Sequence, residues 1–315
     1  MLSACYCHKF KFTVILQMFL CFPAYSLLLS HNLTTKSILL TNKWYRLGID
    51  NINTHLKTVK RKNFNFTVSY KMPHQRQALL LSSSNCHGYS ILEFAKEEIC
   101  NLLTKNNISE LVFIPYAQKD YDNYTAKIKE VIEPWGIAVT GLHSYPNVIE
   151  RINSSKAIFV GGGNTFLLLK TLYEKNLVNL IKRKVDEGSL VYIGSSAGTN
   201  VATKSIHTTN DMPIIYPPSF EAIGIVPFNI NPHYIDIISE THKGETRSQR
   251  ICEYLSMSHA TPVLGLQEGS ILHVDGYQLT IKGISGAVLF KKNGAPVYYA
   301  PGSDVSFLCA QDQEL

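Results

Sequence analysis

From Gln77 onward, short apolar runs alternate with longer stretches in which apolar residues recur every three or four positions. The short runs are typical of buried β-strands, and the longer stretches are typical of amphipathic helices. Strands are predicted over residues 78–82, 110–115, 137–141, 157–160 and 190–194. Helices are predicted over residues 90–103, 121–135, 165–174 and 178–187. Because the strands are almost wholly apolar and separated by helices, we expect an α/β fold with a mostly parallel sheet covered by helices on both faces.

Composition and charge narrow the class of protein. The 315 residues are 45% hydrophobic and 17% charged, as in an ordinary globular protein and unlike a disordered chain or a polytopic membrane protein. Residues 1–76 contain 11 Lys and Arg and one acidic residue, Asp50, whereas residues 77–315 contain 19 Lys and Arg against 23 Asp and Glu. The main part of the chain is therefore mildly acidic, and we expect no nucleic-acid partner for it.

This charge boundary predicts three parts: a basic leader and linker over residues 1–76, a main domain over residues 77–305 and a short tail over residues 306–315. Residues 12–22 are nearly continuous apolar sequence behind a short basic start, which resembles a signal peptide with Ala24 and Ser26 at the small positions of a cleavage site. A membrane anchor over about residues 12–30, an organelle-targeting segment and a leader without a role in the mature protein are the alternatives. Membrane contact is expected only if this segment stays uncleaved.

Other features of the first part do not decide between these alternatives. Glycosylation sequons begin at Asn32 and Asn65, but such triplets also arise by chance. A start at Met72 would leave the main domain intact. The seven cysteines show no CxxC pair and no histidine spacing typical of zinc, so neither a disulfide scaffold nor a metal site is predicted. The four cysteines after residue 77 are typical of thiols in a reducing compartment.

Ser196 stands at the centre of Gly194-Ser-Ser-Ala-Gly198, directly after the predicted strand 190–194. A Gly-x-Ser-x-Gly run between a strand and a helix is typical of a nucleophile elbow, in which a sharp turn exposes the serine hydroxyl. The glycines lack the Cβ atoms that would collide in that turn. The amide of Ala197 would then lie at a helix start, where it can donate to a developing oxyanion.

A second glycine-rich turn follows the strand predicted over residues 157–160. The run Gly161-Gly-Gly-Asn-Thr165 lets backbone N–H groups approach a ligand, either a phosphate or a tetrahedral oxyanion. A Walker phosphate loop is excluded because its Lys and Ser/Thr are missing, and a dinucleotide-binding loop is excluded because the GxGxxG spacing is absent. A tight turn without any ligand is the alternative.

A serine hydroxyl needs a base oriented by a third group. His233, in Asn231-Pro-His-Tyr234, follows an apolar stretch over residues 223–230 that is compatible with a strand. His242 lies in a strongly polar segment instead. Residue type alone does not choose among the 11 histidines.

Five motifs in order resemble peptidase E, the α-aspartyl dipeptidase family, over about residues 77–301. They are Gly161-Gly-Gly-Asn-Thr-Phe166, Gly194-Ser-Ser-Ala-Gly198, Thr208-Thr-Asn-Asp-Met-Pro213, Ile230-Asn-Pro-His-Tyr234 and His242-Lys-Gly-Glu-Thr-Arg247. The runs Leu79-Leu-Leu-Ser-Ser-Ser84 and Gly265-Leu-Gln-Glu-Gly269 are also similar. At Gln267 the sequence departs from the proline of the family pattern, but its neighbour Glu268 is retained.

The resemblance implies a fold like that of the class I glutamine amidotransferases, with serine in place of their cysteine. It implies a cytoplasmic serine-type dipeptidase that hydrolyses dipeptides with an N-terminal aspartate through an acyl-enzyme, without a metal or organic cofactor. A homo-oligomer is compatible with it. A catalytically silent member of the fold that binds a small molecule or a partner, or a hydrolase of other small amides or esters, is the alternative.

By motif match, Ser196 is the nucleophile and His233 the general base. Glu268 and Asp211 both match acidic positions of the family, and we prefer Glu268 as the partner of His233. Its apolar run, Val263 to Leu266, is expected to end a strand at the same edge of the sheet. Asp211 would then shape the pocket or bind the substrate's amino group.

The resemblance also implies the groups that hold the substrate. The amides of Ala197 and of Gly162 or Gly163 are the expected oxyanion donors. Arg247 is the candidate for the aspartyl carboxylate, because a guanidinium makes two parallel hydrogen bonds to a carboxylate. Asn164 is expected to contact the substrate beside it. The alternative for Arg247 is a surface pair with a glutamate, either Glu245 or Glu240.

Overall fold

The computed structural model describes residues 14–16, 27–29, 56–61, 64–69, 75–235 and 244–313. The chain forms two compact units, Met1–Pro73 and His74–Leu315. In the first unit, β1 (Val14–Leu16) pairs with β2 (Leu27–Leu29) and β3 (Leu56–Arg61) pairs with β4 (Phe64–Ser69), both antiparallel. Most of the predicted signal or anchor segment, its cleavage position and the Asn32 sequon lie outside the described residues. No helix among the described residues has the length and hydropathy needed to cross a bilayer.

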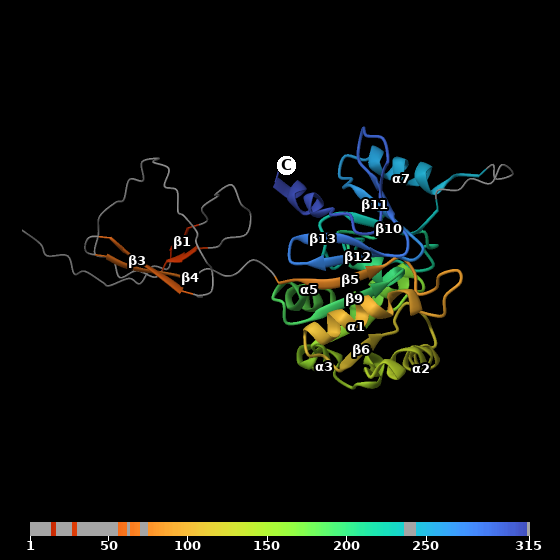
Figure 1. The fold of residues 1–315 in the computed structure, drawn as a ribbon, viewed down its shortest axis with the longest axis horizontal. Helices are drawn as coiled ribbons and strands as arrows, with labels where there is room; N and C mark the ends of the chain where they lie inside the picture. Colours follow the sequence, from red (N-terminus) through yellow and green to blue (C-terminus); the bar gives the residue numbers. More distant parts are fainter. Residues whose placement is uncertain are drawn as a thin grey trace, which may run out of the picture. The chain divides into compact units, whose positions relative to one another are not determined.

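A seven-stranded sheet forms the centre of the second unit (Figure 1). Five neighbouring strands are parallel, which confirms the predicted α/β class. In spatial order they are β5 (Gln77–Leu81), β9 (Val191–Ser195), β8 (Ala157–Val160), β6 (Glu110–Ile114) and β7 (Ala138–Gly141). The antiparallel strands β12 (Ser270–Asp275) and β13 (Gln278–Gly283) extend the sheet beyond β5.

Alternating strand residues bury their side chains on opposite faces of this sheet. From β5, Leu79 and Leu81 pack with α1 (Lys96–Lys105) and α2 (Tyr121–Ile132). Ala78 and Leu80 belong to the core on the other face, which also contains side chains of four more helices. These are α3 (Val148–Ser154), α4 (Thr165–Glu174), α5 (Val178–Asp186) and α6 (Ala197–Val201). Each fully buried leucine stabilises this packing by about 1.5–3 kcal/mol, so the two cores fix the carboxyl ends of the strands.

A second sheet has the order β10 (Asn229–Tyr234), β11 (Val263–Gln267), β14 (Ala287–Phe290) and β15 (Val297–Tyr299), and α7 (Arg247–Ser256) packs against it. The strand expected over residues 223–230 begins only at Asn229. Gly224 has a φ of 71° and Pro227 lacks an N–H donor, so the segment between them is a buried loop. β11 lies beside β10 in this second sheet, which corrects the expectation that its end lies at the edge of the main sheet.

Two helices are shorter in the structure than the hydrophobic periodicity predicts. The helix expected over residues 90–103 begins with η1 (Glu93–Ala95), because Leu92 has a φ of 59°, and continues as α1. The helix expected over residues 121–135 ends as α2 at Ile132, and Pro134 lies in the following η2 (Glu133–Trp135). A further turn, η3 (Leu142–Ser144), follows β7. The predicted tail contains η4 (Ser306–Gln313), whose Leu308 is buried in the core.

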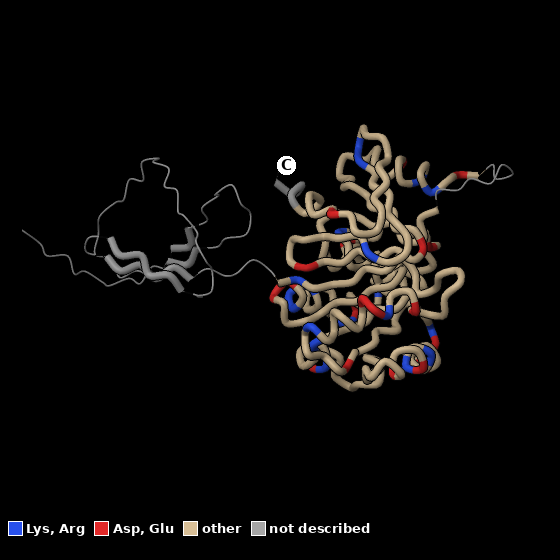
Figure 2. Tube along the Cα trace, in the orientation of Figure 1, with Lys and Arg blue, Asp and Glu red and all other residues tan. Residues whose placement is uncertain are grey.

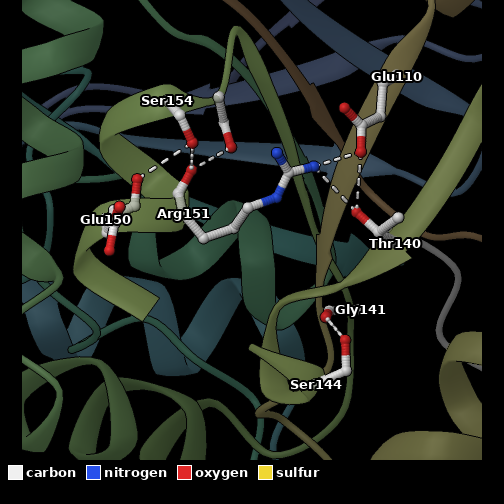
Figure 3. Close-up of polar contacts among 8 residues, drawn as sticks. Glu110, Thr140, Gly141, Ser144, Glu150, Arg151 and Ser154 are labelled. Atoms are coloured by element: carbon white, nitrogen blue, oxygen red, sulfur yellow. Dashed lines mark hydrogen bonds and ion pairs between the residues drawn. The ribbon is translucent and has the colours of Figure 1, made fainter. Parts of the chain in front are cut away.

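The outermost parallel strand, β7, is held in place by polar contacts from α3 (Figure 3). The Arg151 guanidinium forms an ion pair with Glu110 of β6 and donates to the Thr140 hydroxyl of β7 at 3.2 Å. Ser144 donates to the carbonyl oxygen of Gly141 at 2.8 Å where β7 ends. Elsewhere on the unit, positive and negative residues are mixed along the helices and loops (Figure 2).

Candidate active site

Ser196 occupies a strained turn between β9 and α6, with φ 53° and ψ −109°. The turn fits only because its flanking glycines carry no Cβ. A Cβ on Gly198 would lie 2.1 Å from the carbonyl oxygen of Val160, and one on Gly194 would lie 2.6 Å from that of Gly198. The Ser196 amide donates to the carbonyl oxygen of Leu81 at 3.1 Å, which holds the turn against β5. Positive φ at a non-glycine residue costs about 1–3 kcal/mol, so the surrounding packing maintains this conformation.

His233 contacts both Ser196 and Glu268. Its Nε2 lies 2.9 Å from the Ser196 Oγ, and its Nδ1 lies 2.9 Å from the Glu268 Oε1. His233 has a φ of 54° where the register between β10 and β11 shifts, and its backbone amide donates to the Ser82 hydroxyl at 2.9 Å. Glu268 follows β11 at the turn that Gly269 makes with a φ of 84°. The structure therefore brings these three predicted residues into one hydrogen-bonded chain.

Asp211 occupies a different place, at the amino end of α4. Its Oδ2 accepts from the Thr165 amide at 2.7 Å and from the Thr165 hydroxyl at 2.6 Å. The neighbouring Asn164 caps the same helix by accepting from the Leu167 amide, and its Nδ2 donates to the carbonyl oxygen of Met212 at 2.9 Å. Both ends of the Asn164 amide are thus engaged within the protein, and Asn164 positions the loop that carries Asp211.

Arg247 is the first residue of α7 and lies in the electrostatic field of Asp211. Burial lowers the pKa of the Arg247 guanidinium, Arg250 acts in the same direction, and Asp211 opposes both. A capping box fixes the helix start, since Thr246 and Gln249 each bond the other's backbone amide. Glu245, one of the alternative partners considered for Arg247, lies 3.4 Å from Arg250. The other alternative, Glu240, and the residues His242 and Lys243 lie outside the described residues.

The glycine turn after β8 lies against the serine. A Cβ on Gly162 would be 3.0 Å from the Ser196 Cβ, and Gly163 has a φ of 140° with its Cβ position 2.3 Å from the carbonyl oxygen of Ala117. The Tyr124 hydroxyl lies against the same turn, since a Cβ on Gly161 would be 2.6 Å from its oxygen. Burial raises the pKa of Tyr124 to about 12, and the nearby Gly162 backbone acts in the opposite direction. Ala197 begins α6, where amides have no acceptor within the helix.

A pocket of about 270 Å³ opens beside Ser196 and His233. Its other lining residues come from the loop after β5, from the β6–α2 segment and from the glycine turn. They are Ser83, Ser84, Asn85, Ile91, Gln118, Tyr124, Lys127, Ile128, Gly162 and Gly163. Sequence reasoning missed Tyr124 and Lys127, which are three positions apart on α2. Their only local signal is that spacing, which places both on one face of a helix.

A serine at a strand-to-helix turn, bonded to an imidazole that is bonded to a carboxylate, has the geometry of a serine hydrolase. The model of peptidase family S51 matches residues 78–282. The chain therefore belongs to peptidase family S51, and the predicted resemblance to peptidase E is confirmed.

Individual relatives agree with this assignment. The chain is 49% identical over 238 residues to a Drosophila melanogaster protein named "Probable alpha-aspartyl dipeptidase", a match that covers 75% of this chain and 99% of the relative. It is 46% identical over 231 residues to peptidase E of Streptomyces coelicolor, covering 73% of this chain and 93% of the relative. The crystal structure of a peptidase from an acI-B1 Actinobacterium has the same fold, with a TM-score of 0.56 at 16% identity over 74% of this chain and 98% of the other.

Proposed function

We propose that this chain is a serine dipeptidase that hydrolyses dipeptides with an N-terminal aspartate through an acyl-enzyme. The observation that carries the proposal is the continuous contact from Ser196 through His233 to Glu268, at 2.9 Å for each hydrogen bond. The name of the Drosophila relative supports the aspartyl specificity. In this proposal Ser196 is the nucleophile, His233 the general base and acid, and Glu268 the group that orients the imidazole.

The reaction proceeds in two steps. The Ser196 hydroxyl attacks the peptide carbonyl while His233 Nε2 accepts its proton, and the resulting imidazolium protonates the leaving amine. Water then attacks the acyl-enzyme with His233 again as base, which releases aspartate and restores the serine. The Ala197 amide and an amide of the Gly162–Gly163 turn stabilise the oxyanion, each by about 3–4 kcal/mol in the transition state.

The two ends of the aspartyl residue bind on the α4 side of Ser196. Arg247 holds the side-chain carboxylate, which is consistent with its partial burial and with the opposing field of Asp211. Asp211 binds the substrate ammonium through Oδ1, since its bonds to Thr165 use Oδ2. A substrate that lacks the carboxylate leaves a half-buried guanidinium unpaired, which is the physical basis for rejecting Asn-X.

We place this activity in residues 77–305 and in the cytoplasm. The curated relatives support the first point, because they match about three quarters of this chain along nearly their whole length. The free thiols of Cys86, Cys100 and Cys252, all in the described part of the chain, support a reducing compartment.

Replacing the nucleophile tests the proposal. Ser196→Ala should lower kcat for Asp-Leu by about 10⁶-fold, because triad enzymes lose that much with their nucleophile. Ser195→Ala is the matched control, since its hydroxyl contacts Ser84 at 2.7 Å in the same turn, and it should stay within a few-fold of the parent. Hydrolysis of Asp-Leu, Asn-Leu and Glu-Leu is followed by amine release. Near-normal turnover by Ser196→Ala would exclude the serine mechanism, and a preference for a dipeptide without aspartate would exclude the specificity.

A further inference from the structure

The pocket and the proposed aspartyl-binding groups lie on opposite faces of the main sheet. Tyr124, Lys127 and Ile128 line the pocket from α2, which packs on the face that holds Leu79 and Leu81. Asp211 is bonded to the amino end of α4, which packs on the other face. Ser196 lies between these two regions at the carboxyl end of β9. The two halves of a dipeptide bound at Ser196 therefore reach different faces.

Proton transfer decides which half enters the pocket. The general acid must reach the nitrogen of the leaving residue, so that residue lies on the side of His233. His233 lines the pocket, whereas Arg247 and Asp211 are absent from its lining. The leaving residue consequently occupies the pocket, and Ile91 and Ile128 give its side chain an apolar surface.

The leaving residue of a dipeptide carries a free carboxylate, and such an anion requires a cationic or hydrogen-bonding partner when it leaves water. Among the residues that line the pocket, Lys127 and His233 are the only ones that can carry positive charge, and His233 is engaged by Ser196 and Glu268. Gln118 and Asn85 add neutral amide donors. Lys127 lies three positions after Tyr124 on α2, so the two residues line the pocket from one face of the helix.

We propose that Lys127 binds the terminal carboxylate of the leaving residue and so makes the enzyme select dipeptides over longer or blocked peptides. This inference rests on the proposed function, because it assumes that the acyl residue binds toward Arg247. A third residue in the substrate would replace the carboxylate by a neutral amide and leave the ammonium without its partner. Lys127 is a specificity residue for the leaving group, separate from the residues that choose the aspartate.

The test compares Asp-Leu with Asp-Leu amide, which differ only in that carboxylate. The parent should cleave the free acid with a kcat/KM about tenfold above that of the amide, which is the size expected for one charge-assisted hydrogen bond. Lys127→Met should raise KM for Asp-Leu about tenfold and leave the amide unchanged, which removes the preference. Lys127→Arg should retain most of it. Lys129→Met is the matched control, because Lys129 lies on the same helix beside Glu133 and outside the pocket lining, and it should behave as the parent.

Two results would overturn the inference. One is an equal loss of activity on the acid and the amide in Lys127→Met. The other is loss of the acid-over-amide preference in Arg247→Leu together with loss of the Asp-over-Asn preference in Lys127→Met, which would mean that the substrate binds in the opposite direction. If the parent does not cleave Asp-Leu, the proposed aspartyl dipeptidase function is wrong, but the role of Lys127 is still open to test. In that case the same comparison of kcat/KM is made between the free-acid and amide forms of whichever dipeptide the parent cleaves, with Lys127→Met as the variant.

Discussion

Ser196 gains its reactivity from its neighbours, since a serine hydroxyl is a weak nucleophile at neutral pH. His233 is held from three directions, by the Ser196 hydroxyl, the Glu268 carboxylate and the bond from its own amide to Ser82. The Glu268 side chain is 47% exposed, so water competes with the imidazole for its oxygens. A carboxylate in this position fixes the tautomer of His233 and stabilises the imidazolium, but less strongly than a fully buried one.

Glu268→Gln should therefore lower kcat for Asp-Leu by about 10³-fold, somewhat less than the loss of about 10⁴-fold seen for a buried triad aspartate. KM should change little, because the amide occupies the same space and Glu268 does not line the pocket. Asp211→Asn is the comparison, and it should act mainly by raising KM. Steady-state kinetics on both variants separate the two roles. If Asp211→Asn gave the larger loss in kcat, the role of orienting His233 would pass to Asp211.

Sequence patterns located only part of the candidate site. Ser196 was predictable because glycines on both sides of a serine after an apolar strand are a local signal of a sharp turn. Tyr124 and Lys127 were not predictable, because on an amphipathic helix their exposed face is indistinguishable from ordinary solvated surface. They reach the site through the packing of α2 on the sheet, where the Tyr124 ring lies edge-on to Phe113 of β6 and its hydroxyl lies against Gly161. Such long-range contacts leave no trace in local spacing.

At the scale of elements, the alternation of strands and helices was predictable because buried parallel strands are continuous apolar runs. The predicted boundaries of helices and strands were wrong where the backbone conformation of one residue interrupts the hydrophobic period. Leu92 adopts a left-handed φ of 59°, so the helix expected from residue 90 begins with a 3₁₀ turn. The apolar stretch 223–230 is buried like a strand, yet its amides at Ile223 and Ile225 bond to the end of α6. Hydrophobicity alone predicts that a segment is buried, but it does not show whether its amides bond to a neighbouring strand or to a helix end.

The elbow depends on close contact between β8 and the start of α6, and Gly198 provides it. Gly198→Ala would force a Cβ to within 2.1 Å of the Val160 carbonyl oxygen, a backbone atom that cannot move without separating two paired strands. We expect a loss of about 3 kcal/mol in the free energy of unfolding, together with loss of activity. Urea denaturation followed by circular dichroism measures the change.

Gly136→Ala is the control for the backbone contribution, since Gly136 has a φ of 82° but open space around its Cβ position. It should cost about 1–2 kcal/mol, from the left-handed backbone alone. Equal losses for the two variants would show that the contact with Val160 is relaxed at little cost. Gly198 would then contribute less to the stability of the nucleophile turn than its short contact with Val160 indicates.

At the scale of the whole molecule, two histidines that do not line the pocket couple the stability of the second unit to pH. Burial lowers the pKa of His207, whose ring packs against Phe220, Tyr254 and His259, and the charge of His259 acts in the same direction. Burial also lowers the pKa of His273 in β12. Glu98 and Asp275 oppose this shift, while Lys282 and Lys105 reinforce it.

A histidine whose pKa is lower in the folded state binds fewer protons there than in the unfolded chain. Above pH 6.5, the ordinary value, both states are neutral and no stability is lost. As the pH falls below 6.5, the unfolded chain takes up protons first, and stability declines until the folded-state pKa is passed. Thermal unfolding should therefore show a lower Tm at pH 5.5 than at pH 7.5. His207→Gln and His273→Gln should each reduce that difference, whereas His87→Gln, at an exposed loop position, should leave it unchanged. If the double variant His207→Gln, His273→Gln kept the full difference in Tm between pH 7.5 and pH 5.5, other groups would be responsible for the loss of stability in acid.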